Sequence, residues 1–365
     1  MIAPVRFLVL SIIIIIGNLF AAESSANAAK PIQQFVTVEE NVKLEVIDWG
    51  GTGRPLVLLA GLGNTAHTFD KFAPKLAAKY HVYGITRRGF GVSSAPETGY
   101  SSERLGEDVL AVLNELKLER PILAGHSIAG AELSYIASTH PERVVGLIYL
   151  EAAYSYAYYN GDPNNSLNIA IDANELRKKL DEFAPVEPWG LKQRNEELLA
   201  LIQQVEKELS AQQEFLSIKD MHEPPEPPKE KAFLAMQASA RRIMNGLQKY
   251  KNIPVPTLAI YAFPKNPKTY GPLPKAAVEM TISQEKAQID AFEKGVPMAR
   301  VVRIPNATHG VYITNEADVL REIELFIGKL PPVDDAKLNQ EPVSTTQSYT
   351  RDDAQLAPAE GAPHP

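Results

Sequence analysis

Short apolar segments alternate with amphipathic stretches along most of the chain. Residues 33–50, QQFVTVEENVKLEVIDWG, alternate apolar and polar positions as a hairpin of two strands does. The run PLVLLA at 55–60 is continuously apolar, which is typical of a strand buried on both faces. Further strands are predicted at 81–86, 121–124, 144–150, 257–263 and 299–304. Helical spacing lies between them, so the pattern predicts an α/β fold, a mostly parallel twisted sheet flanked by helices.

The alternation stops between about residues 154 and 250. Helical spacing at Leu198, Ile202, Val205 and Leu209 and the proline-rich loop HEPPEPPKE at 222–230 indicate an inserted helical segment. We therefore expect a core in two parts, 29–153 and 253–330, with a helical cap inserted at 154–252. Residues 331–365 hold almost no large apolar side chain, which predicts a disordered tail.

The first 28 residues have the pattern of a secretory signal peptide. One arginine precedes an apolar core, and Ala26-Asn27-Ala28 is an A-x-A cleavage site. An uncleaved membrane anchor is the alternative, but the apolar run is shorter than the roughly 20 residues that a spanning helix needs. We expect an exported protein, periplasmic or extracellular, with no stable membrane insertion once residues 1–28 are removed.

Composition narrows the chemistry. There is no cysteine, which excludes thiol catalysis and disulfides, and the formal net charge of −7 provides no basic footprint for nucleic acid. No residues are spaced as a metal site, so we expect neither a metal nor a cofactor. The expected partner is a small-molecule substrate, and the sequence does not indicate an oligomeric state.

One serine stands at a predicted strand-to-helix turn. The segment PILAGHSIAG, 121–130, places Ser127 between small residues in the pattern G-x-S-x-A. A nucleophile at such a turn needs small neighbours because the backbone is strained there. A polar residue that simply packs at the turn is the alternative.

Four stretches together resemble the α/β-hydrolase superfamily. Besides the serine motif, AGLGNTAHTF at 60–69 matches the family's oxyanion loop, and TRRGFGVSS at 86–94 resembles its R-G-x-G-x-S turn. PNATHGVYITN at 305–315 lies where the family places its catalytic histidine. The resemblance covers about 36–155 and 255–330, and it implies a serine hydrolase with a helical cap.

His309 is the predicted base. It is the histidine that lies in a loop after a strand and after the serine, in the order Ser…acid…His. His126 adjoins Ser127, but its side chain is expected to point away, and His67 in the oxyanion loop is a candidate to line the pocket. The other histidines lie in less suitable places: His81, His140, His222 and His364.

The acid departs from the family's usual position. That position follows TLAIYAF, but no carboxylate occurs there before Glu279. Some members, including haloalkane dehalogenases, place the acid one strand earlier, where Glu151 closes LIYLE. Glu151 is therefore the predicted acid, with Asp290 and Asp318 as weaker alternatives on predicted helices.

Two backbone N–H groups are expected to form an oxyanion hole, those of Leu62 and Ile128. Tyr154 and Tyr156, just after the predicted acid, are candidates to line the pocket. The segment GLGNTA at 61–66 also fits a dinucleotide fingerprint, G-x-G-x-x-A. However, the predicted strand before this segment is not the first strand of the chain. A dinucleotide-binding site would also leave Ser127 and His309 without a role.

The sequence thus predicts an exported serine hydrolase that acts on a small carboxylic ester or related acyl compound through a Ser-His-acid triad and an acyl-enzyme. The alternative is a non-catalytic ligand-binding protein with a degenerate hydrolase fold, which the missing carboxylate after TLAIYAF favours.

Overall fold

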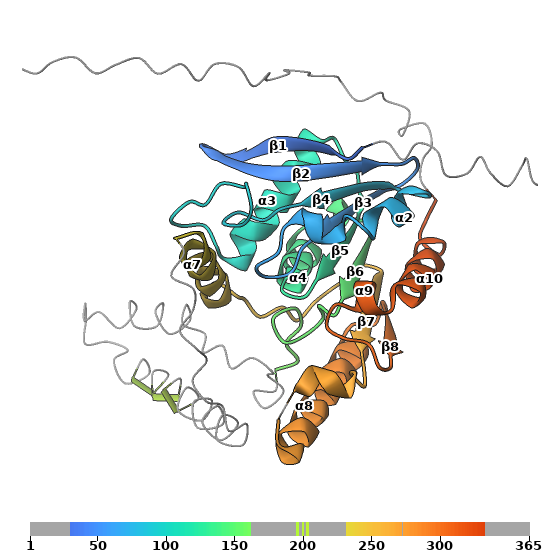
Figure 1. Ribbon diagram of the computed structural model, residues 1–365. Helices are drawn as coiled ribbons and strands as arrows, with labels where there is room; N and C mark the ends of the chain where they lie inside the picture. Colours follow the sequence, from blue (N-terminus) through green and yellow to red (C-terminus); the bar gives the residue numbers. More distant parts are fainter. Residues whose placement is uncertain are drawn as a thin grey trace, which may run out of the picture. The chain divides into compact units, whose positions relative to one another are not determined.

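An 8-stranded sheet runs through the part of the chain that the structure describes, in the order β1-β2-β4-β3-β5-β6-β7-β8 (Figure 1). The structure is a computed structural model, and it describes residues 30–161, 195–196, 199–200, 202–203, 231–271 and 273–332. The strands are β1 (Ile32–Glu39), β2 (Val42–Gly50), β3 (Pro55–Leu59), β4 (His81–Ile85), β5 (Ile122–His126), β6 (Gly146–Leu150), β7 (Thr257–Ala262) and β8 (Ala299–Ile304).

The sheet is mixed at one edge and parallel elsewhere. β1 and β2 form an antiparallel hairpin, and β2 pairs antiparallel with β4. From β4 through β3, β5, β6, β7 and β8 every neighbouring pair is parallel. The predicted α/β fold is therefore confirmed, with strands at the positions that the apolar segments indicated.

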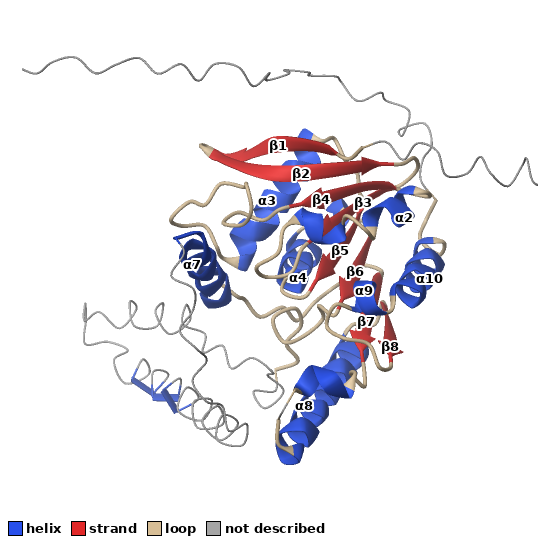
Figure 2. Cartoon of the chain, in the orientation of Figure 1, coloured by secondary structure: helices blue, strands red, loops and turns tan. Residues whose placement is uncertain are grey.

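Helices cover both faces of this sheet (Figure 2). The α-helices are α2 (Ala73–Ala77), α3 (Ser102–Glu115), α4 (Ala129–Thr139), α7 (Lys231–Asn245), α8 (Lys275–Gly295), α9 (Val311–Thr314) and α10 (Glu316–Ile327). The described residues also form the short 3-10 helices η1 (Ala66–Phe69), η2 (Pro141–Arg143) and η4 (Pro267–Tyr270). α8 begins earlier than the helix predicted around 282–294, directly after Pro274.

The alternation of side chains along each strand creates two cores. Along β6, Leu147 and Tyr149 belong to one core with α3, α4 and α8, whereas Ile148 and Leu150 belong to the other with α2 and α10. β5, β6 and β7 are buried along their whole length. This two-sided burial explains why these strands read as continuous apolar runs.

The parallel strands bring their carboxyl ends to one edge of the sheet. Ligand sites of open α/β sheets form outside that edge. The segments that leave it are the loop from Ala60 after β3, the turn from Thr86 after β4, Ser127 after β5, Glu151 after β6, the loop from Phe263 after β7, and the loop at 305–310 after β8. All of the predicted site residues belong to these segments or follow them closely.

Several sequence predictions lie outside the described residues. They are the signal peptide at 1–28, most of the cap between 162 and 230, and all of the predicted tail beyond residue 332. Of the cap, α7 is described, and it packs on the core through buried Ile243. Within the described ranges, no helix combines the length and the apolar character needed to cross a membrane.

Candidate active site

Ser127 occupies a tight turn between β5 and α4. Its φ of 54° is in the left-handed region, which a non-glycine residue adopts only when the surroundings enforce it. Its N–H donates to the Leu150 carbonyl at 3.2 Å. A Cβ on Gly125 would lie 3.0 Å from the Ala129 Cβ, so the small residues on either side of the serine are what permits this turn.

His309 links Ser127 to Glu151. Its Nε2 lies 2.9 Å from the Ser127 Oγ, and its Nδ1 lies 3.1 Å from the Glu151 Oε2. A carboxylate only accepts, so Nδ1 carries the hydrogen and Nε2 is free to accept from the serine hydroxyl. The loop at 305–310 brings these three side chains together across 182 residues of sequence.

Glu151 is held on several sides. It has no exposed surface, and its φ of 51° turns the chain sharply at the end of β6. Its Oε1 accepts a hydrogen bond of 2.6 Å from the Ala262 N–H, and the Tyr154 hydroxyl lies 2.9 Å from both carboxylate oxygens. A buried carboxylate needs such partners, and these also fix its direction toward His309.

The two alternative acids lie elsewhere. Asp290, on α8, accepts from Arg303 at 3.0 Å. Asp318, on α10, pairs with Arg321 at 2.8 Å. The structure therefore brings Glu151, and neither aspartate, to His309.

The loop after β3 passes directly over Ser127. A Cβ on Gly61 would lie 2.7 Å from the His126 Nδ1 and 3.3 Å from the Ser127 Cβ, so this approach requires a glycine. Leu62 follows Gly61, and Ile128 is the N-cap residue of α4, where helix N–H groups lack intrahelical partners. Both backbone segments adjoin the serine, and their role as oxyanion donors stays a prediction.

Arg87 supports that loop and was missed by the sequence analysis. Its Nη2 donates to the Ala60 carbonyl at 2.9 Å and to Glu132 of α4 at 2.9 Å. Arg87 and Glu132 are both buried. The segment TRRGFGVSS marked this turn, but a partner 45 residues away could not be identified from it.

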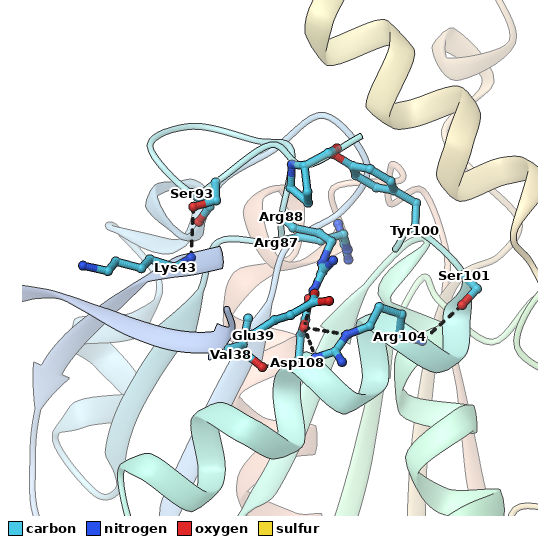
Figure 3. Close-up of polar contacts among 12 residues, drawn as sticks. Val38, Glu39, Lys43, Arg87, Arg88, Ser93, Tyr100, Ser101, Arg104 and Asp108 are labelled. Carbon is cyan, nitrogen blue, oxygen red and sulfur yellow. Dashed lines mark hydrogen bonds and ion pairs between the residues drawn. The ribbon is translucent and has the colours of Figure 1, made fainter. Parts of the chain in front are cut away.

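The neighbouring Arg88 contacts α3 and β1 instead of the loop after β3 (Figure 3). It is almost fully buried and binds Asp108 of α3 through Nη2 at 2.6 Å and Glu39 of β1 at 3.0 Å. Arg104 donates to the same Asp108 oxygen at 2.6 Å. These ion pairs join β1, α3 and the turn after β4.

His126 contacts the predicted base. Its Nε2–H donates to the His309 carbonyl at 2.9 Å, and the two rings lie 4.8 Å apart. Burial, helped by the neighbouring His309, lowers the pKa of His126 to about 4, so its imidazole is neutral near pH 7. The expectation for this side chain concerned only Ser127, and it overlooked the contact with the loop after β8.

The candidate pocket residues divide into two groups. Tyr154 and Tyr156 are both buried beside the site: the Tyr154 hydroxyl donates to Glu151, and the Tyr156 phenol interacts with the Ser127 side chain. His67 is half exposed, and its described contacts run to Asp70 at 3.1 Å and Glu45 at 3.3 Å rather than to Ser127 or His309.

Comparisons with known proteins agree with this fold. A model of the alpha/beta hydrolase family matches residues 56–322. A putative non-heme haloperoxidase of Mycobacterium phage D29 is 34% identical over 111 residues, which cover 30% of this chain and 40% of that protein. A pimeloyl-[acyl-carrier protein] methyl ester esterase of Aeromonas hydrophila is 28% identical over 157 residues, 41% of this chain and 60% of that protein. The chain thus spans less than two thirds of the length of either relative.

Solved structures give the same result at the level of the fold. The bromoperoxidase from Bacillus anthracis has a TM-score of 0.51 and 18% identity, over 81% of this chain and 100% of that chain. The family match begins in β3, ends in α10 and includes the serine turn, the end of β6 and the histidine loop. The chain therefore belongs to the alpha/beta hydrolase family.

Proposed function

We propose that the protein is an exported serine hydrolase that cleaves a small carboxylic ester or a related acyl compound. The observation that carries this proposal is the continuous contact from the Ser127 Oγ through the His309 imidazole to the buried Glu151. A serine hydroxyl becomes nucleophilic when an oriented base can take its proton, and these contacts have that arrangement.

The first half of the reaction forms the acyl-enzyme. Ser127 Oγ attacks the acyl carbon while its proton moves to His309 Nε2, and Glu151 stabilises the imidazolium through Nδ1–H. The oxyanion of the tetrahedral intermediate accepts hydrogen bonds from the Leu62 and Ile128 N–H groups. The intermediate then collapses: the bond to the leaving alcohol breaks, and the alcohol oxygen takes the proton from His309.

The second half releases the acid. A water molecule gives its proton to His309 and attacks the acyl carbon, and the acid leaves as Ser127 regains a proton. One ester and one water thus yield one acid and one alcohol, and no cofactor is needed. The methyl ester esterase named among the relatives supports an ester substrate. Tyr154 and Tyr156 connect the acid to the cap and would contact the acyl group.

The non-catalytic alternative depended on the missing carboxylate after β7. The contact of Glu151 with His309 supplies a carboxylate from β6 and speaks against that alternative. Export rests on residues 1–28 alone, and N-terminal sequencing of the secreted protein tests it by looking for a mature chain that begins near Ala29.

Labelling with a fluorophosphonate tests the proposed chemistry. The purified protein should be labelled, and Ser127→Ala should abolish the labelling. Ser283→Ala, an exposed serine on α8, is the matched control and should be labelled like the wild type. A wild type that shows native circular dichroism and takes no label would overturn the hydrolase and favour a binding protein.

A further inference from the structure

Lys265 lies in the loop after β7, where the sequence analysis looked for the acid and found none. Its side chain is 10% exposed. The Nζ lies 3.5 Å from the Glu151 Oε2 and forms an ion pair with Glu285 of α8. The segment after β7, where the family usually has its acid, thus carries a cation instead. That cation lies beside the carboxylate of Glu151, which follows β6.

The surroundings keep Lys265 charged. Burial alone lowers its pKa, but Glu151 and Glu285 outweigh that effect and hold the pKa above its ordinary value. The Tyr154 hydroxyl lies 3.5 Å from Nζ, and the Tyr154 ring lies 5.5 Å from it. The ammonium group is therefore bound on several sides, which a buried charge requires.

Glu285 is the second member of this pair. Burial raises its pKa, and the nearby Lys265 opposes that effect and favours the charged form. Its charge also acts on His309, since the imidazole is among the groups that perturb the pKa of Glu285. Tyr270 of η4 faces Glu285 as well.

Titratable groups surround His309 from several of the described segments. His126, the last residue of β5, is neutral near pH 7 because burial lowers its pKa to about 4, and Ser127 follows it in the turn. Tyr154 and Tyr156 come from the segment after β6, and burial raises the pKa of both phenols, which therefore stay protonated. Glu151 contacts His309 directly, Lys265 is linked to it through Glu151, and Glu285 interacts electrostatically with it.

We propose that Lys265 is a positioning residue that acts on His309 through Glu151: the ammonium group, held in place by Glu285, offsets part of the Glu151 charge and so extends the working range of His309 to lower pH. This inference rests on the proposed function. A carboxylate beside an imidazole favours imidazolium, which cannot act as a base. A cation next to that carboxylate weakens this effect while leaving the hydrogen bond from Nδ1–H intact.

Neutral substitutions at Lys265 and Glu285 test the effect of each charge on His309 independently. Lys265→Met removes the cation, so protonation of His309 should become easier and its titration curve should move to higher pH. Glu285→Gln removes an anion and frees Lys265 to interact more closely with Glu151, so the titration curve of His309 should move to lower pH. Lys265→Arg keeps the charge and should stay near the wild type. The double variant Lys265→Met/Glu285→Gln removes both charges and should also return close to the wild type.

The experiment follows the His309 imidazole by NMR over pH 4–9, with the resonance assigned by its loss in His309→Gln. The opposite shifts of the two single variants and their cancellation in the double variant are the expected result. If Lys265 had a purely structural role, the variants would lose activity, but the His309 titration would not shift in opposite directions in the two single variants. Unchanged titration in both single variants, or shifts of the same sign, would overturn the proposal. If Lys265→Met does not fold, Glu285→Gln still tests the predicted shift to lower pH.

Labelling with a fluorophosphonate distinguishes this inference from the proposed function. The labelling rate should follow the fraction of neutral His309. The acidic limb of the plot of labelling rate against pH should therefore move to higher pH in Lys265→Met and to lower pH in Glu285→Gln. A wild type that is labelled, with acidic limbs that do not move, overturns the role of Lys265 and leaves the hydrolase standing. An unlabelled wild type overturns the hydrolase, while the NMR titration still decides the charge coupling.

Discussion

Gly130 and Ala152 approach each other so closely that a Cβ on Gly130 would lie 1.9 Å from the Ala152 carbonyl oxygen. Gly130 lies in the first turn of α4, and Ala152 follows Glu151. This contact joins the helix that begins at the serine turn to the segment that carries the acid. The distance between Ser127 and Glu151 therefore depends on the absence of a Cβ at Gly130.

Gly130→Ala should separate the two segments. Because the obstacle is backbone, the clash can be relieved only by moving α4 or residues 151–153, and overpacking of this kind costs about 1–3 kcal/mol. We expect a lower midpoint in urea unfolding and slower labelling of Ser127. Gly328→Ala is the control, since its φ of −63° is helical and suits alanine. Equal stability of both variants would contradict the prediction.

Glu151→Gln should slow the reaction strongly without unfolding the protein. An amide can present its N–H to His309 and select the wrong tautomer, and such a change in a triad costs about 10³–10⁴ in rate. The rate of ester hydrolysis and of labelling measures this. Asp290→Asn, at the alternative acid on α8, should keep nearly full activity. A large loss in Asp290→Asn together with an active Glu151→Gln would reverse the assignment.

Arg87→Met should destabilise the protein and disturb the loop after β3. It leaves Glu132 buried without its cation, and breaking a buried ion pair costs about 3–5 kcal/mol. The double variant Arg87→Met/Glu132→Leu removes both charges, so urea unfolding should show it to be more stable than the single variant. Because both lose the hydrogen bond to the Ala60 carbonyl, both should label slowly. Wild-type labelling in either one would contradict the supporting role of Arg87.

Acid should destabilise the protein partly through His126. Its pKa is about 4 in the folded state, against an ordinary value of 6.5, so the unfolded chain binds the proton first. This contribution is complete above pH 6.5 and is lost as the pH falls through 4, by about 3 kcal/mol in all. His126→Gln can still donate to the His309 carbonyl, and it should show a smaller loss of unfolding free energy between pH 7 and 4. Identical slopes in the two proteins would contradict this.

Local patterns were sufficient for much of the fold and for two site residues. The apolar segments marked the strands because a strand buried on both faces has no polar positions. Ser127 was identifiable because its turn demands small residues two positions away on either side, Gly125 and Ala129. His309 followed from its place after a strand. Each of these constraints acts over a few residues of sequence, and a local pattern can record it.

The pairing of charged groups around the site could not be predicted from local sequence patterns. Glu151 could be named only with Asp290 and Asp318 beside it, because nothing near Glu151 in sequence tells that His309 lies 3.1 Å away. The partners of Arg87, His126 and Lys265 were missed altogether. Each is a buried polar group whose cost depends on what another strand or helix places next to it.

By itself, then, the sequence determined the alternation of strands and helices, the strained turn at Ser127 and the loop that carries His309. Only the tertiary structure decided that the carboxylate of Glu151 contacts His309 and that the ammonium group of Lys265 lies next to this carboxylate. The physical reason is that backbone strain and hydrophobic burial are imposed by neighbouring residues, whereas the pairing of buried charges is set by distances across the sheet edge.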